Sequence, residues 1–157
     1  MSACGFQPLY GSKGSSNIVA DLSDVRVAPI KNRIGQLLSN ELKHLLNPLR
    51  TPINPKYDLI TTLTQSTRSL AVKKTALATR ANLLINSHHH LIDIQSQQVL
   101  TSATNSITVS YNIYSSQYAT LSAEKDATKR ATKELAQDIR LQIGIFFKTR
   151  NKQSVVQ

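Results

Sequence analysis

Three consecutive histidines, His88, His89 and His90, are the side chains best suited to chemistry, since imidazole binds metal ions and exchanges protons near neutral pH. Successive side chains of a strand point to opposite faces, so His88 and His90 would share one face and His89 the other. A metal site would need a third ligand, such as Asp93, and groups that orient the ligands. We therefore interpret the run as the polar end of a strand and predict neither a metal site nor a cofactor.

No group of residues in the sequence has the pattern of an enzyme active site. The phosphate-binding patterns G-x-x-x-x-G-K-[ST] and G-x-G-x-x-G are absent, and no serine stands in G-x-S-x-G. Asp126 and Glu134 lie two helical turns apart, but both have basic neighbours at helical spacing, which favours ion pairs over acid–base catalysis. We predict a protein that acts by binding and is not an enzyme.

Four cations gather around one predicted turn between two strands: Arg68, Lys73, Lys74 and Arg80. Such a cluster at a hairpin end forms a compact surface for an anionic ligand. The same charges would also deter pairing of the sheet with other chains, and the sequence favours neither interpretation. A second basic set at helical spacing is interpreted as a solvated helix face: Lys125, Lys129, Lys133 and Arg140.

The composition indicates a basic protein with one domain. The 157 residues include 19 Lys and Arg against 9 Asp and Glu, and the net charge of +10 predicts an anionic partner such as nucleic acid, acidic lipid or an acidic protein surface. No apolar run reaches the roughly 18 residues of a membrane-spanning helix. The single cysteine excludes internal disulfides and zinc sites built from several thiolates.

The spacing of apolar residues predicts the elements in the first third of the chain. Residues 1–22 are rich in Gly and Ser and predict a flexible leader. Val25, Val27 and Ile30 predict a short strand. Asn32 is expected to cap a helix that ends before Pro48. The apolar positions of this helix share one face at a period of 3.6: Ile34, Leu37, Leu38, Leu42, Leu45 and Leu46.

Three strands and a long helix complete the predicted order. Apolar and polar residues alternate in 57–63, 78–88 and 106–114, which predicts strands with one buried face. A helix over 118–150 would bury one stripe: Leu121, Ala127, Ala131, Leu135, Ile139, Ile143 and Phe146. The order β-α-β-β-β-α predicts an α+β two-layer sandwich, a four-stranded mixed sheet with two helices on one face. Residues 23–150 would form the single domain and 151–157 a tail.

The leader resembles the mature start of a known family. Residues 4–11 read Cys-Gly-Phe-Gln-Pro-Leu-Tyr-Gly, which is similar to the Cys-Gly-Phe-x-Pro-Leu-Tyr-Gly of the alphaproteobacterial LptE family of lipopolysaccharide-assembly lipoproteins. Weaker matches follow in the family's order along nearly the whole chain: Arg33-Ile34-Gly35-Gln36, Thr79-Arg80, Tyr111-Asn112, Tyr118-Ala119, Asp126-Ala127 and Arg130-Ala131. The family fold is a two-layer α/β sandwich, in agreement with the pattern of the residues.

This resemblance implies a function at the outer membrane. Members of the family are lipid-anchored to the outer membrane and face the periplasm. They plug the β-barrel protein LptD, assist its assembly and help deliver lipopolysaccharide to the outer leaflet. Cys4 matches the lipidated cysteine, although Met1-Ser2-Ala3 is no export signal, so its lipidation is an expectation for the natural precursor.

The hairpin cations suit such a role, because lipopolysaccharide carries phosphates and acidic sugars. We expect Arg68, Lys73, Lys74 and Arg80 to contact lipid A phosphates or the acidic core. A polar outer face of the sheet would also fit the polar lumen of a barrel.

A nucleic-acid-binding module is the alternative. The α-β-β-β-α order and the basic, alanine-rich stretch 122–131 resemble a double-stranded-RNA-binding domain, and the net charge of +10 agrees. Against this, Glu124 and Asp126 interrupt the basic start of the helix, and the hairpin lacks aromatic residues for stacking. We therefore expect no nucleic-acid partner.

Overall fold

The computed structural model of the protein describes residues 15–48, 52–70 and 79–154. Its elements follow in the order α1 (Ser15–Ser23), β1 (Val25–Val27), α2 (Asn32–Leu46), β2 (Tyr57–Leu70), β3 (Arg80–Asp93), β4 (Val99–Asn112) and α3 (Gln117–Ser154). From β1 onward the predicted order β-α-β-β-β-α is confirmed, and α1 precedes it.

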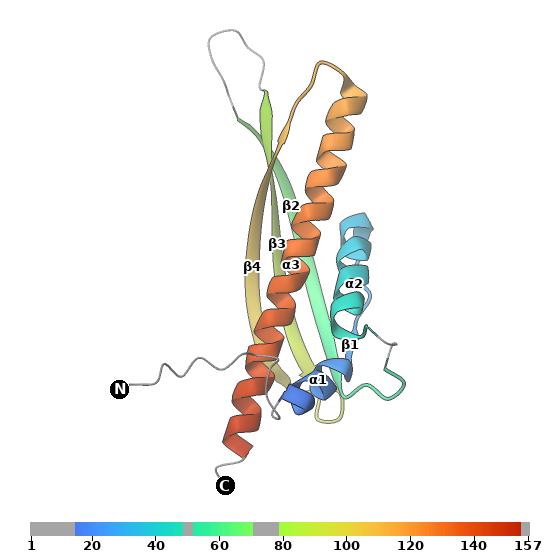
Figure 1. The fold of residues 1–157 in the computed structure, drawn as a ribbon, viewed down its shortest axis with the longest axis vertical. Coiled ribbons are helices and arrows are strands. Elements are labelled where there is room, and N and C mark those ends of the chain that lie inside the picture. Colours follow the sequence, from blue (N-terminus) through green and yellow to red (C-terminus); the bar gives the residue numbers. More distant parts are fainter. Residues whose placement is uncertain (1–14, 49–51, 71–78, 155–157) are drawn as a thin grey trace, which may run out of the picture.

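The four strands form one mixed sheet in the order β1-β2-β3-β4. β1 pairs parallel with β2, and the other two pairs are antiparallel. α2 and α3 lie over the same face, and no helix of the described residues covers the other face (Figure 1). The predicted α+β two-layer sandwich is therefore confirmed, with β4 as an open edge strand along the side of the sheet.

Alternation of side chains assigns the two faces of the sheet. In β3 the odd-numbered residues from Ala81 to Leu91 are buried beneath the helices. Even-numbered residues of β2 pair with even-numbered residues of β3, so these share the outer face. That face is rich in Thr, Ser and Asn. Burial of one face only is what the period-two pattern predicted.

The buried stripe of α3 repeats every four residues and packs on the sheet and on α2. Six members of this stripe are fully buried: Ala127, Ala131, Leu135, Ile139, Ile143 and Phe147. Two predicted members were wrong, because Leu121 is 47% exposed and Phe146 is only partly buried. Phe147, four residues after Ile143, takes the place predicted for Phe146 since it continues the four-residue spacing.

The strands are longer than predicted, at 14 residues each in β2, β3 and β4. The turn between β3 and β4 is correspondingly short, over residues 94–98. Asp93 sets this turn, since its Oδ1 accepts hydrogen bonds from the backbone N–H groups of Gln95 and Ser96 at 3.0 and 2.9 Å. These bonds to the carboxylate also lower the pKa of Asp93, the largest cause being the Ser96 N–H.

α1 corrects the prediction of a flexible leader for residues 15–22. Ile18 and Leu22 stand four residues apart and are buried in the core, so this short Ser-rich segment is helical because of its packing. At the other terminus, α3 runs to Ser154, four residues beyond its predicted end and into the predicted tail. The structure does not describe residues 1–14, where Cys4 lies.

The start of α2 also differs from the prediction. Lys31 occupies the N-cap position without a side-chain hydrogen bond, and Asn32, the predicted cap, is the first helical residue with a φ of 74°. The chain folds back closely here. A Cβ on Gly35 would stand 2.6 Å from Cγ2 of Ile30 and 2.9 Å from its carbonyl oxygen. The close approach requires glycine at this position.

Candidate functional site

We name the end of the sheet where β2 ends at Leu70 and β3 begins at Arg80 the hairpin end. Arg68 pairs with Asn82 and Leu70 pairs with Arg80, so the two arginines are diagonal neighbours on the outer face. This places their Cβ atoms about 7 Å apart, and both side chains are exposed. Lys73 and Lys74, the other two predicted members of the cluster, lie outside the described residues.

Neither helix covers β2 at the hairpin end (Figure 1). Gln65, Thr67 and Ser69 belong to the face that is buried elsewhere in the sheet, yet all three are exposed. On the outer face, Ser110 donates a hydrogen bond from Oγ to Oδ1 of Asn82 at 2.7 Å, beside Arg68. The hairpin end thus presents polar groups and two arginines on strands that are open to solvent.

A groove lies between the N-terminal parts of α2 and α3 beside Gln65 of β2, with a volume of about 360 Å³. We name it the hairpin-end groove, and its lining is Arg33, Ile34, Leu37, Gln65, Leu121, Glu124, Lys125, Thr128 and Lys129. Among the described residues, no carboxylate forms an ion pair with its three cations. Lys125 and Lys129 are solvent-exposed, as predicted for a helix face, but they border an apolar groove, which the sequence analysis missed.

The chemistry of this groove is amphipathic. Arg33 on α2 and the two lysines on α3 line the groove together with Ile34, Leu37 and Leu121. Glu124 is the one acidic lining residue, and it also acts on Tyr111, whose pKa is raised first by burial and then by that carboxylate. Cations beside aliphatic side chains suit a ligand with an anionic head and an apolar part.

The histidine run lies inside β3, so its interpretation as the polar end of a strand was wrong. The predicted alternation is correct: His89 is 1% exposed beneath the helices, and the rings of His88 and His90 lie 5.5 Å apart on the outer face. Burial lowers the pKa of His89, and the two neighbouring histidines lower it further. Among the described residues, no three His, Cys, Asp or Glu side chains are placed to hold a metal ion.

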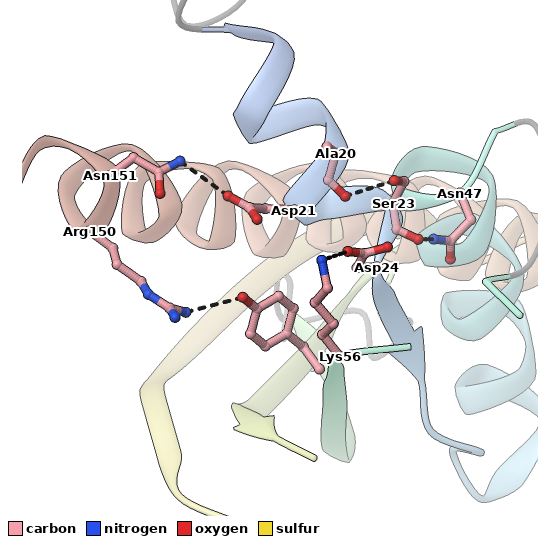
Figure 2. A network of polar contacts seen from close by, with 9 residues as sticks. Ala20, Asp21, Ser23, Asp24, Asn47, Lys56, Arg150 and Asn151 are labelled. Atoms are coloured by element: carbon pink, nitrogen blue, oxygen red, sulfur yellow. Dashed lines mark hydrogen bonds and ion pairs between the residues drawn. The ribbon is translucent and has the colours of Figure 1, made fainter. Parts of the chain in front are cut away.

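Polar contacts join α1, α2, β2 and α3 at the opposite end of the molecule, which we name the α1 end (Figure 2). Asn151 of α3 donates a hydrogen bond to Oδ2 of Asp21 at 3.1 Å. Asn47 donates one to the carbonyl oxygen of Ser23 at 2.9 Å. Lys56 pairs with Asp24 at 2.7 Å. These contacts fix α1 against the C-terminal ends of both long helices.

A second groove, the α1-end groove, lies between α1, the end of α2 and the segment before β2. It has a volume of about 660 Å³ and is lined by Val19, Ala20, Ser23, Asp24, Leu46, Asn47, Pro48, Pro52, Ile53 and Asn54. Val19 and Ile53 on its rim are 53% and 75% exposed. This groove was not predicted from the sequence, although the spacing of Ile18 and Leu22 indicates the helix that forms one of its sides.

No helix among the described residues is both long and apolar enough to cross a membrane. α3 has the length, but it carries many charged side chains along its surface.

Comparisons with known proteins agree with this architecture. The family model described as LptE, lipopolysaccharide-assembly, matches residues 22–143. An uncharacterised protein of Rickettsia prowazekii, RP188, is 28% identical over 147 residues, which cover 94% of this chain and 90% of that protein.

Solved structures share the fold at low sequence identity. A lipoprotein of Caulobacter crescentus superposes with a TM-score of 0.69 at 23% identity, covering 83% of this chain and 96% of that one. Rare lipoprotein B of Shewanella oneidensis gives 0.59 at 11% identity, covering 82% and 96%.

Proposed function

The chain belongs to the LptE lipopolysaccharide-assembly family, and from this membership we propose that it plugs and helps assemble an LptD β-barrel and helps deliver lipopolysaccharide to the outer leaflet. In this proposal the protein is held at the periplasmic side of the outer membrane by a lipid on Cys4. The family is a non-enzymatic lipoprotein family, so the protein acts by binding.

The bare outer face of the sheet supports the barrel part of the proposal. Its side chains from β2, β3 and β4 are mainly Thr, Ser, Asn and His, and none of the described helices covers them (Figure 1). The interior walls of outer-membrane barrels are polar and hydrated. A sheet face of mainly polar side chains can lie against such a wall with little apolar surface to bury, and its two arginines stand apart from the middle of the face, at the hairpin end.

The hairpin end supports the lipopolysaccharide part of the proposal, and the observation that carries it is the pairing of cations with an apolar groove. Arg68 and Arg80 stand on the outer face, with Lys73 and Lys74 between them in the sequence. Arg33, Lys125 and Lys129 border the aliphatic side chains of the hairpin-end groove. Arginine binds phosphate through two hydrogen bonds, and lysine binds it as a point charge. In this proposal the aliphatic side chains of the groove contact a segment of an acyl chain.

Binding of purified lipopolysaccharide by charge variants tests this assignment. One test variant replaces all four hairpin cations, Arg68, Lys73, Lys74 and Arg80, with glutamine. A second test variant replaces the three groove cations, Arg33, Lys125 and Lys129, with glutamine. The matched control is Arg130, Lys133 and Lys148→Gln, which removes three charges outside both sets. We expect about a tenfold loss of affinity or more for each test variant, since charge-assisted bonds contribute about 1.5–3 kcal/mol each, and little change for the control. Unchanged affinity of both test variants at low salt would refute the site.

Capture from detergent-solubilised outer membranes tests the barrel partner. The natural precursor with a C-terminal tag should retain a large β-barrel protein in near one-to-one amount, and a Cys4→Ala precursor should retain far less. Recovery of RNA without a barrel would favour the double-stranded-RNA-binding alternative. A direct competition at matched salt separates the two, since any polyanion binds a protein of charge +10 in a salt-dependent way.

A further inference from the structure

We propose that the α1-end groove and its rim residues Val19 and Ile53 form a membrane-contact surface, which rests on the phospholipids of the leaflet that holds the Cys4 anchor. The inference depends on the proposed lipidation of Cys4. In this proposal the folded domain touches the same membrane directly, in addition to the lipid anchor. This contact is distinct from the contact with the barrel and from the hairpin end.

The length of the chain before α1 supports phospholipid as the partner of this groove. Ten residues lie between Cys4 and Ser15, so the two Cα atoms are at most about 40 Å apart when that stretch is fully extended. α3 has 38 residues and is therefore about 57 Å long. Its C-terminal part contacts α1 through Asn151 and Asp21, whereas its N-terminal part lies toward the hairpin end (Figure 1). An anchor at Cys4 thus holds the α1 end, and not the hairpin end, near the lipid surface.

The chemistry of the rim fits the boundary between headgroups and acyl chains. Ile53 is three-quarters exposed and Val19 is about half exposed, which places two branched aliphatic side chains beside one groove. Pro48 and Pro52 line the same groove and have no backbone N–H to desolvate. Lys43, exposed in the last turn of α2, lies one turn before the groove residue Leu46 and can reach the headgroups.

The rim is held in place before any contact is made. Asn47 binds the carbonyl oxygen of Ser23, and Ser23 in turn donates a hydrogen bond from Oγ to the carbonyl oxygen of Ala20 at 2.7 Å (Figure 2). Lys56 neutralises Asp24 at the wall of the groove. A preformed apolar rim adds to a lipid anchor as a second, weaker membrane signal.

Two features of the composition allow a direct test. The chain has no tryptophan and a single cysteine, so Ile53→Trp creates a unique fluorophore and Cys4 can be coupled to a maleimide lipid in vesicles of phosphatidylethanolamine and phosphatidylglycerol. The matched control is Tyr118→Trp, because Tyr118 is 83% exposed in the first turn of α3, near the hairpin end. Brominated phospholipids then quench only the tryptophan that enters the bilayer boundary.

We expect brominated lipid to quench the Ile53→Trp protein about twofold or more with a blue shift of emission, because interfacial side chains enter the boundary by about 5–10 Å. The Tyr118→Trp protein should be unaffected, and adding Val19→Ser to Ile53→Trp should reduce the quenching. Equal quenching of both reporters, or none at position 53, would overturn the proposal. Shielding of position 53 only after the barrel is added would also overturn it, since the groove would then be a protein interface.

The outcome is separable from the proposed function. Chemical coupling replaces lipidation in the cell, so absence of quenching counts against the membrane surface even if lipopolysaccharide and the barrel are bound. Conversely, a precursor that captures no barrel would remove the proposed function without changing the quenching result.

Discussion

At the hairpin end, neither helix covers β2 and its residues are exposed on both faces, whereas at the α1 end three helices meet and are joined by side-chain hydrogen bonds (Figures 1 and 2). The hairpin end is ordered mainly by the ladder between the strands, and its cations and aliphatic residues stay available to a ligand. The α1 end is ordered by packing and specific polar contacts. One sheet therefore carries a solvent-exposed polar end and a closely packed end.

The largest effect should come from truncating the core at the closely packed α1 end. Phe147 is fully buried, and its ring lies 5.0 Å from that of Tyr57. Phe147→Ala should lower the free energy of unfolding by about 3–5 kcal/mol, because it leaves a cavity and removes a ring contact. Denaturation in urea measures the loss. Ile145→Ala, at a half-exposed site on the same helix, is the control and should cost far less.

A smaller loss is expected close to the hairpin-end groove. Gly35→Ala would place a methyl group against Ile30, including its backbone carbonyl oxygen, which cannot move as freely as a side chain. We expect a destabilisation of about 2 kcal/mol, within the range for overpacking. Thermal unfolding monitored by circular dichroism tests it. An equally destabilising Gln36→Ala at the exposed neighbouring position would contradict the steric explanation.

Acidification should destabilise the middle of the sheet, between the two ends. The pKa of His89 is lowered in the folded protein by burial, with His88 and His90 adding repulsion. Between that pKa and the unfolded value of about 6.5, the unfolded state binds more protons, so stability falls as pH falls below about 6.5. For one such group the loss between pH 7.5 and 5.5 is at most about 1.4 kcal/mol. In urea titrations, His89→Gln should make the free energy of unfolding less dependent on pH. The control His44→Gln, on the exposed face of α2, should keep the pH dependence of the unmodified protein.

The smallest effect should be local to α1. Asn151→Ala removes the hydrogen bond to Asp21 and should cost about 1 kcal/mol of local stability. Amide hydrogen exchange in α1 should then accelerate about fivefold, as expected for a helix that opens separately from the sheet. Exchange in β2 and β3 at the hairpin end should not change. A uniform acceleration would mean that α1 opens only with the whole domain.

Patterns that depend on a single element were predictable from the sequence. The alternation around Ala81, Leu83 and Ile85 gave the face of β3, and the 3.6-residue period gave the buried side of α2 through Leu38 and Leu42. The hairpin arrangement of Arg68 and Arg80 followed from the same alternation. These features require only that one face of each element meets a core.

Features that depend on how elements meet were not predictable. α1 is Ser-rich and nine residues long, and Ile18 and Leu22 hold it only because α3 reaches that far. Leu121 was predicted in the core, but it precedes Ala127 by six residues, which is off the four-residue spacing of the buried stripe, and it borders a groove. Both grooves form between segments distant in sequence, so no local pattern of residues indicates them.

The open side of β4 has a consequence for the life of the protein before it meets its partner. The strand runs for 14 residues without a charged residue or a proline, and the described chain adds no strand beyond it. Such an edge offers a row of unpaired backbone groups to any extended chain, including another copy. A free copy of the folded protein is therefore prone to self-association at high concentration, and a partner that covered β4 would prevent it.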